Sequence, residues 1–154
     1  MTTAGQICNI EVVTTGRNTT VADAAKLMRE RHVGTLVVVE SDDGGKRPLG
    51  IVTDRDMVME VLALDGDPYA ETVEDIMVDD LATVRDEQDV REALELMRHR
   101  GVRRLPVVNS GGYLLGIVAL DDLSRLLAED MAALAAITAR EQSREAAQRK
   151  AAVG

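Results

Sequence analysis

Apolar residues recur at helical spacing in two well-separated segments of the chain. In both segments they fall at positions i, i+3, i+4 and i+7, which form one face of an amphipathic helix. The two sets are Val21, Ala24, Ala25 and Met28, and Val90, Ala93, Leu94 and Met97. Each member of the second set lies 69 positions after its counterpart in the first, so the chain contains an internal repeat.

The two predicted helices also begin in the same way. Thr20 and Asp89 stand at N-cap positions, and the acidic residues Asp23 and Glu92 follow three positions later. A side-chain oxygen at the N-cap satisfies free backbone N–H groups, and a carboxylate in the first turn interacts favourably with the helix dipole. The capping pattern therefore supports the same register as the apolar pattern.

Segments with strand character surround each predicted helix. The apolar runs after the helices indicate buried strands, and a glycine pair after each run indicates a turn. A second strand then ends in Gly-Ile-Val, and a second helix closes the repeat. The predicted ranges are strands at 12–14 and 81–84, buried strands at 36–39 and 105–108, turns at 44–45 and 111–112, Gly-Ile-Val at 50–52 and 116–118, and closing helices at 55–64 and 122–129. Each repeat is therefore a β-α-β-β-α unit.

Turn residues mark the boundary between the repeats, at Asp65-Gly66-Asp67-Pro68. We expect a mixed α/β (α+β) fold with one unit at residues 7–66, a second at 67–130, and a C-terminal helical extension at 131–154. The extension is rich in helix-forming Ala, Glu, Gln and Arg. Its apolar row begins before residue 131 and comprises Leu123, Leu127, Met131, Leu134 and Ile137. The polar end beyond Thr138 either frays or packs on a partner chain.

Composition narrows the range of functions. The chain has 154 residues, of which 45% are apolar, so it is long enough to form a core. It contains no Phe or Trp and only two Tyr, which leaves no aromatic platform for single-stranded nucleic acid. A net charge of −9 disfavours nucleic acid and acidic membranes as partners. Only the cations at 98–104 favour DNA binding.

Several chemical classes find no support in the sequence. The single cysteine, Cys8, excludes an internal disulfide and leaves no second thiolate for a metal site. No segment approaches the roughly 18 apolar residues of a membrane span, and residues 1–10 lack the basic segment followed by an apolar stretch that is typical of a signal peptide. No nucleophile elbow, P-loop or zinc-protease motif is present. We therefore expect a cytoplasmic protein that is not an enzyme, has no metal site and does not contact a membrane.

Three motifs carry a family resemblance. They are Gly-Ile-Val-Thr-Asp-Arg-Asp at 50–56, Asp-Ile-Met at 75–77 and Gly-Val-Arg-Arg-Leu-Pro-Val-Val at 101–108. Together with the duplication, they resemble the CBS domain, the regulatory module of cystathionine β-synthase, over about residues 7 to 130. The resemblance implies a stand-alone CBS pair packed about a pseudo-twofold axis, with a cleft between the sheets and a homodimer of such pairs. It also implies a regulatory role toward a partner protein that the sequence does not identify.

The resemblance assigns a phosphate contact to Thr53 and a ribose contact to Asp56. Both residues stand at the start of a predicted helix, where free N–H groups and the helix dipole favour a phosphate, and a carboxylate accepts hydrogen bonds from ribose hydroxyls. An alternative needs no ligand, because Thr53 also suits an N-cap position with Asp56 as its N3 partner. Within the duplicated pattern we favour the ligand-binding interpretation.

Other positions complete the expected site by the same resemblance. Thr14 and the backbone near Leu36 line the slot for the base, and Arg103 and Arg104 of the second unit supply cations. The implied ligand is AMP, ADP, ATP or another adenosyl compound, and no cofactor is required. A ligand-free dimerisation and interaction platform is the alternative.

The second copy of the site is weaker. Its motif has Ala119 where the first has Thr53, so it lacks the hydroxyl for a phosphate. Thr83 and Asp122 are the remaining counterparts of Thr14 and Asp56, and the first unit offers Gly34-Thr35 where the second offers two arginines. We expect one competent anion-binding site per chain.

Overall fold

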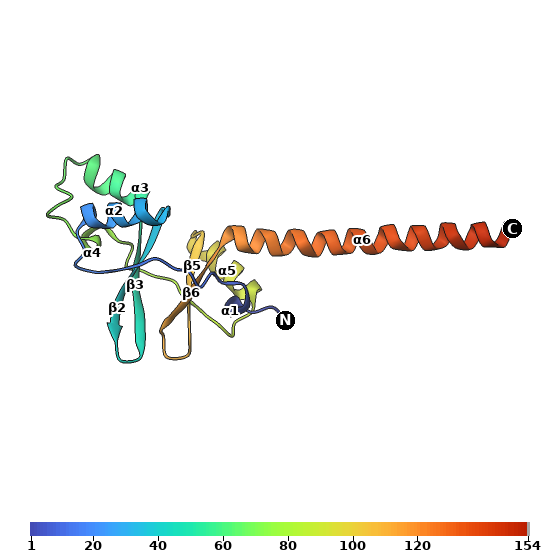
Figure 1. Ribbon diagram of the computed structural model, residues 1–154. Helices are drawn as coiled ribbons and strands as arrows, with labels where there is room; N and C mark the ends of the chain where they lie inside the picture. Colours follow the sequence, from blue (N-terminus) through green and yellow to red (C-terminus); the bar gives the residue numbers. More distant parts are fainter. Residues whose placement is uncertain (154) are drawn as a thin grey trace. The chain divides into compact units, whose positions relative to one another are not determined.

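The computed structural model describes residues 1–153 and divides into two compact units, Met1–Ala119 and Leu120–Gly154 (Figure 1). The first unit contains the whole first repeat and the second repeat up to its last strand. The second is a single helix, α6 (Leu120–Val153). Gly154, the last residue of the predicted extension at 131–154, lies outside the described residues.

The first repeat forms a three-stranded sheet with two helical segments. Its elements are β1 (Thr14–Gly16), α2 (Val21–Arg31), β2 (Thr35–Asp42), β3 (Gly45–Thr53), α3 (Asp54–Met57) and the π-helical segment η1 (Val58–Leu62). The sheet order is β1-β2-β3, with β1 parallel and β3 antiparallel to β2. The closing helix predicted at 55–64 is present as α3 followed by η1, so its second half is π-helical.

The second repeat has the same topology. Its elements are β4 (Val84–Arg85), α5 (Val90–Arg100), β5 (Arg104–Val108) and β6 (Leu114–Ala119), followed by α6, and its sheet order is β4-β5-β6. The predicted β-α-β-β-α unit is confirmed in both copies. The opening strands begin at Thr14 and Val84, two to three residues later than predicted.

The capping residues of the long helices act as the sequence indicates. The Thr20 hydroxyl accepts a hydrogen bond from the Asp23 backbone N–H at 3.2 Å, and the Asp89 carboxylate accepts one from the Arg91 backbone N–H at 2.8 Å. Both helices end in a left-handed residue, His32 or Gly101. These local signals fix the two helix boundaries at equivalent positions.

Two short helices, α1 (Ala4–Ile7) and α4 (Val73–Ile76), open the two repeats and were not predicted. They belong to equivalent opening segments, residues 2–13 and 71–82. Each opening segment packs on the other repeat. The Val73 backbone N–H donates to Thr19 at 2.9 Å, whereas the Val90 backbone N–H donates to Thr2 at 3.0 Å. The two repeats therefore exchange their opening segments, which makes Met1–Ala119 one interlocked unit.

The hydrophobic core of the first repeat contains residues from this exchange. Buried side chains of α2, β2, β3 and η1 pack against two from the second repeat's opening segment, Val73 and Ile76. The cluster comprises Val21, Ala24, Met28, Leu36, Val38, Val52, Val61, Val73 and Ile76. The first repeat therefore completes its core with side chains from the second.

Gly50 and Gly116 stand where the opening segments cross the last strands. Ile51 exchanges two backbone hydrogen bonds with Val78, at 3.2 and 3.0 Å, and Ile117 exchanges two with Asn9, at 2.8 and 3.0 Å. A Cβ at Gly50 would lie 2.6 Å from the Val78 carbonyl oxygen, and one at Gly116 would lie 2.7 Å from that of Asn9. Glycine precedes Ile-Val in both repeats because a crossing backbone occupies the space of a side chain.

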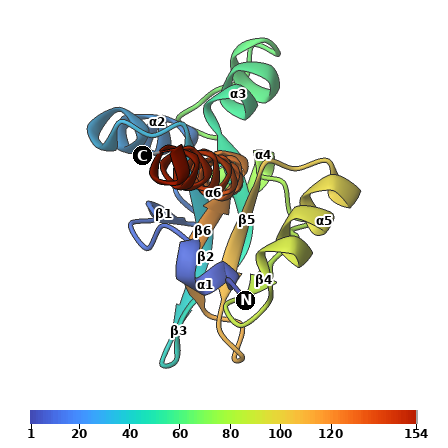
Figure 2. The ribbon, with the colours of Figure 1, turned by 90° about the vertical axis from the view of Figure 1, so that its right-hand side faces the viewer.

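The β2–β3 and β5–β6 hairpins run side by side with their tips toward the same end (Figure 2). Arg47 joins the two tips. Its guanidinium lies 4.2 Å from the centroid of the Tyr113 ring and donates to the Gly111 carbonyl and the Tyr113 hydroxyl, both at 2.9 Å. Its Nε also bonds to Asp42 at 3.1 Å. This contact ties the repeats together at the end away from Thr53.

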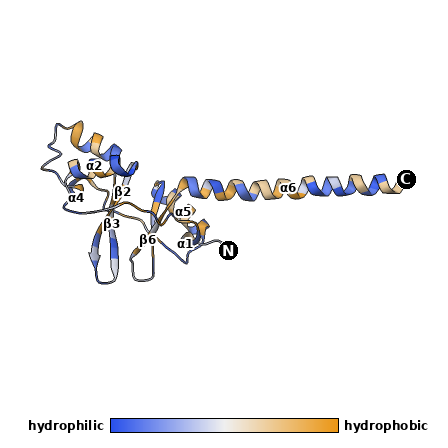
Figure 3. Ribbon diagram, viewed as in Figure 1, coloured by the Kyte–Doolittle hydropathy of each residue, from blue (hydrophilic) through white to orange (hydrophobic). Residues whose placement is uncertain are grey.

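No helix within residues 1–153 is both long and apolar enough to cross a membrane. The long helix α6 carries an exposed apolar row in its first half and mostly polar residues in its second half (Figure 3). The predicted helical extension is thus confirmed as far as residue 153, and it joins the closing helix of the second repeat without a break.

Candidate functional site

A cavity of about 240 Å³ lies within the Met1–Ala119 unit and is lined by both repeats. The first opening segment forms one wall, the start of β2 forms another, and β5 and β6 of the second repeat close it. The lining residues are Asn9, Glu11, Val12, Val13, Val33, Gly34, Thr35, Val37, Arg104 and Ile117. A concave, largely apolar space with a few polar groups is the usual form of a small-molecule site.

The alternation of side chains along β2 decides which of its residues face the cavity. Thr35 and Val37 line it, whereas Leu36 between them is fully buried in the core of the first repeat. Successive side chains of a strand point to opposite faces. Near the predicted base slot, the residues on either side of Leu36 therefore line the cavity, whereas the Leu36 side chain packs into the core.

Arg104 brings a positive charge to the cavity. It is the first residue of β5, is exposed and lines the cavity. Within residues 1–153 its guanidinium takes part in no ion pair or side-chain hydrogen bond. Glu11 also lines the cavity without pairing to Arg104. The five guanidinium donors of an arginine in this state are available to a phosphate or carboxylate.

Thr53 and Asp56 satisfy each other at the start of α3. The Asp56 backbone N–H donates to the Thr53 hydroxyl at 3.2 Å, and the Thr53 backbone N–H donates to the Asp56 carboxylate at 2.8 Å. This capping box is the ligand-free arrangement considered from the sequence. Thr53 is the cross-strand partner of Thr35, which lines the cavity, so the helix start lies beside the cavity wall.

Gly34, which lines the cavity, contacts Asp54, the first residue of this helix. The Asp54 backbone N–H donates to the Gly34 carbonyl at 3.0 Å, and a Cβ on Gly34 would lie 2.9 Å from an Asp54 carboxylate oxygen. Sequence reasoning did not single out Asp54. Asp54 lies this close to the backbone before β2 because Gly34 has no side chain.

The other predicted residues of the first site lie outside the cavity lining. Lys46 donates to the Thr14 hydroxyl at 3.2 Å, and the preceding residue, Val13, is the one that lines the cavity. Arg103 is exposed and precedes β5. Of the two adjacent arginines, the structure brings Arg104 to the cavity.

The residues of the weaker second site fall in different units. Thr83 lines an open hollow of about 560 Å³ beside α5, together with Arg91, Glu95 and His99. Asp122 belongs to α6, where it forms an ion pair with Arg125 at 2.7 Å. The hollow is lined by two glutamates, Glu92 and Glu95, and only one arginine, so it lacks the uncompensated positive charge of the first cavity.

Sequence reasoning missed the contribution of the first opening segment. Asn9, Glu11, Val12 and Val13 line the cavity, but the short strand predicted at 12–14 gave no sign that this segment reaches the second repeat. Their position depends on the crossing at Gly116, and the glycine before Ile-Val was the only local signal of that crossing.

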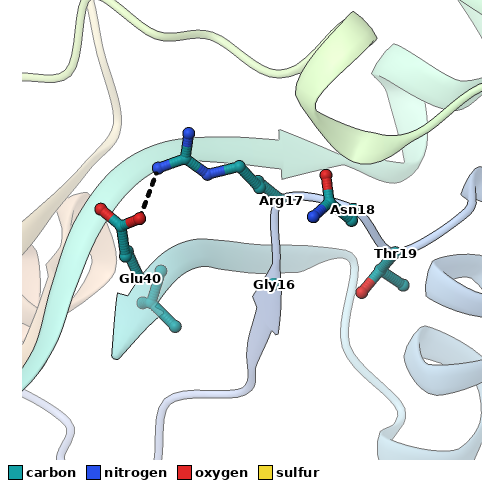
Figure 4. Close-up of a pocket in the computed structure, with 6 residues that line it drawn as sticks. Gly16, Arg17, Asn18, Thr19 and Glu40 are labelled. Atoms are coloured by element: carbon teal, nitrogen blue, oxygen red, sulfur yellow. Dashed lines mark ion pairs between the residues drawn. The ribbon is translucent and has the colours of Figure 1, made fainter. Parts of the chain in front are cut away.

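A second hollow lies at the turn after β1, lined by Gly16, Arg17, Asn18, Thr19, Val39 and Glu40 (Figure 4). Arg17 is its only cation. Its guanidinium pairs with Glu40 at 2.9 Å and with Glu74 at 3.8 Å. Because the charge of Arg17 is already compensated, this hollow is a poorer anion site than the cavity at Arg104.

Comparison with known proteins identifies the family. The CBS domain model matches the chain twice, at residues 4–63 and 73–129. Hypoxic response protein 1 of Mycobacterium tuberculosis is 38% identical over 129 residues, which cover 84% of this chain and 87% of that protein. The uncharacterized protein MK0525 of Methanopyrus kandleri is 36% identical over 77% of this chain, and the match spans 59% of its own length.

Solved structures show the same fold. The crystal structure of Hypoxic Response Protein I with two coordinated zinc ions matches with a TM-score of 0.72 at 37% identity, covering 81% of this chain and 98% of that one. Within residues 1–153 no three His, Cys, Asp or Glu side chains are grouped to hold a metal ion.

The CBS domain pair of MJ0100, solved with 5′-methylthioadenosine and S-adenosyl-L-methionine, matches with a TM-score of 0.71 at 26% identity, covering 84% of this chain and 98% of that one. The two matches to the family model, the exchanged opening segments and the similar solved structures all support the same family. The chain belongs to the CBS domain family, and its two repeats form a CBS domain pair.

Proposed function

We propose that this CBS pair is a non-catalytic regulatory module that binds one adenosyl compound, of the AMP, ADP, ATP or S-adenosylmethionine class, in the cavity at Arg104. Ligand occupancy is then signalled to a separate partner protein. The apolar walls at Val13, Val37 and Ile117 suit a base, and Arg104 suits the negatively charged part of the ligand.

The observation that carries this proposal is the unpaired guanidinium of Arg104 in a cavity shared by two repeats. The chain carries a net charge of −9, so an uncompensated cation at a concave apolar site is the main attraction for an anion. The binding of adenosyl compounds by the MJ0100 CBS pair supports the ligand class. Glu11, on the same cavity, is available to accept hydrogen bonds from ribose hydroxyls or from an amino group.

The cavity volume of about 240 Å³ lies below the roughly 300–1,000 Å³ of typical ligand pockets. We therefore infer that the cavity holds the nucleoside part, and that charged groups extend toward the exposed Arg103. Thr53 and Asp56 would take part only by releasing their mutual capping hydrogen bonds. Thr83 and Asp122 would form at most a weaker second site.

Thermal unfolding with AMP, ADP, ATP and S-adenosylmethionine tests the proposal. A ligand at 100 times its Kd that binds only the folded state adds about 2.7 kcal/mol, which corresponds to a rise of roughly 5–10 °C in Tm for a chain of this size. Arg104→Gln should abolish most of that rise. Arg29→Gln is the matched control, because Arg29 is exposed, forms no ion pair in the described chain and lies on α2 away from the cavity lining.

A Tm that responds to none of these ligands would refute the proposal, as would equal losses in the Arg104 and Arg29 variants. Isothermal titration of the wild type gives the stoichiometry, for which we expect one site per chain. Two equivalent sites would contradict the asymmetry between the repeats.

A ligand-free dimerisation platform is the second candidate, and one surface favours it. A groove of about 360 Å³ between α2 and η1 is mostly apolar, and Leu62 and Tyr69 on it are 72% and 73% exposed. Pairing of this face with a second copy would bury these side chains, as the homodimer of CBS pairs requires. Leu62→Glu should then lower the molar mass in light scattering without changing the ligand response, and unchanged mass would reject this interface.

A further inference from the structure

The helix α6 presents an apolar row that nothing in its own unit covers. Leu127, Met131 and Leu134 follow one another at i, i+4 and i+7, and Ile137 lies at the edge of the same face. These four side chains are 62–65% exposed. At about 1.5 Å per residue, a 34-residue helix extends for about 50 Å, and a free helix with such a row is marginally stable in water.

Charges on α6 are separated along its length. Residues 120–131 contain four acidic side chains and one arginine, residues 132–139 contain no charged side chain, and residues 140–150 contain four basic side chains and two glutamates. The basic side chains are Arg140, Arg144, Arg149 and Lys150, and none of them forms an ion pair within the described chain. The helix therefore has an acidic start, a neutral apolar middle and a basic end.

We propose that α6 pairs antiparallel with α6 of a second copy of this chain. In this arrangement the acidic start of each helix lies beside the basic end of the other. A parallel pair would instead place like charges together, which is unfavourable. The same charge pattern also complements the helix dipole in a single chain, but the dipole does not account for the exposed apolar row.

The apolar row and the charges select the same register. When Met131 faces Leu134 of the second copy, the pairing is centred between residues 132 and 133, and Leu127 then lies within one residue of direct opposition to its Ile137. The same centre places Asp121 opposite Arg144 of the second copy, with Asp122 next to that position and Arg140 about one turn away. In this register, the four exposed apolar side chains of each helix are covered by the other helix. This pairing needs no ligand and is independent of the cavity at Arg104.

Disulfide cross-linking of the full chain tests both the pairing and its direction. In a Cys8→Ser background, Met131→Cys should form a cross-linked dimer on mild oxidation, because position 131 lies about one turn from its counterpart. Glu145→Cys should not, since residue 145 lies on the same face but about 38 Å from its counterpart in the antiparallel pair, at 1.5 Å per residue. Ala136→Cys controls for random collisions, because position 136 lies nine residues, about 180°, around the helix from Leu127.

A second substitution separates pairing from chance contact. Adding Leu134→Glu to the Met131→Cys chain should reduce the cross-link yield about tenfold or more, since a buried leucine is replaced by a charge. Adding Ala136→Glu, on the opposite face, should leave the yield unchanged. Equal yields at positions 131 and 145 would indicate a parallel pair and overturn the proposal. No cross-link above the Ala136→Cys level, or a yield insensitive to Leu134→Glu, would overturn it as well.

Discussion

Substituting Gly50 with alanine tests the exchange of opening segments that makes Met1–Ala119 one unit. Gly50 lies in β3, where the Val78 backbone crosses it. The added Cβ would lie 2.6 Å from the Val78 carbonyl oxygen and 2.7 Å from the Met77 sulfur. The methionine side chain is able to move, but the Val78 backbone is held by two hydrogen bonds with Ile51, one accepted by its carbonyl and one donated by its N–H. The clash therefore has to separate the two segments.

Three contributions set the size of the effect. Overpacking a close contact costs about 1–3 kcal/mol. Weakening the two Ile51–Val78 hydrogen bonds costs about 0.5–1.5 kcal/mol for each bond that is lost. Replacing glycine lowers the entropy of the unfolded chain and returns about 0.4–1 kcal/mol. We expect Gly50→Ala to reduce the free energy of unfolding by about 2 kcal/mol, with the close contact as the largest contribution.

Urea unfolding followed by circular dichroism measures this change. With a slope of about 2 kcal/mol per molar urea, the midpoint should fall by about 1 M. Gly16→Ala in β1 is the matched control, because a Cβ there meets nothing closer than the Thr19 hydroxyl at 4.0 Å. Its midpoint should stay the same or rise slightly. If both variants shift equally, the crossing at Gly50 does not constrain the fold and the exchange argument fails.

Three further substitutions separate structural from ligand-binding roles. Leu36→Ala should destabilise the protein by about 2–5 kcal/mol, because it leaves a cavity in the core; a urea midpoint shift of under about 0.3 M would contradict this placement. Thr53→Ala should lower the free energy of unfolding by about 1 kcal/mol because the capping box is lost, whereas Thr53→Ser should keep most of the stability because its hydroxyl also caps the helix. Equal unfolding midpoints for the two variants would contradict a capping role for Thr53. The Gly44 backbone N–H, with Tyr113 and Arg47, holds the pKa of Asp42 below its usual 3.8. A carboxyl whose pKa is lower in the folded than in the unfolded protein stabilises the fold at pH values above its unfolded pKa. This stability is lost as the pH falls through its folded pKa. Asp42→Asn should therefore show a smaller loss of stability between pH 5 and pH 2 than the wild type, and parallel pH profiles of the urea midpoint would refute the contact.

The sequence by itself determined the local elements of this protein. The apolar spacing of Val21–Met28 and Val90–Met97 requires one buried helix face, and Thr20 and Asp89 fix where the helices begin. The 69-residue offset then made the second repeat a copy of the first. The capping boxes at Thr3 and Thr72 are equally local, and they mark the short helices α1 and α4 that went unpredicted.

Only the tertiary structure decided which residues share the cavity. The opening segment at 9–13 reaches it because its backbone crosses β6 at Gly116, about one hundred residues away in the chain. Such a contact depends on how two sheets pack, and no periodicity within either segment encodes it. The same packing turned Leu36 inward and Thr35 outward, because neighbouring strand residues face opposite sides. It also placed Arg104, the first residue of β5, on the cavity wall, whereas Arg103 precedes the strand and lies outside the lining.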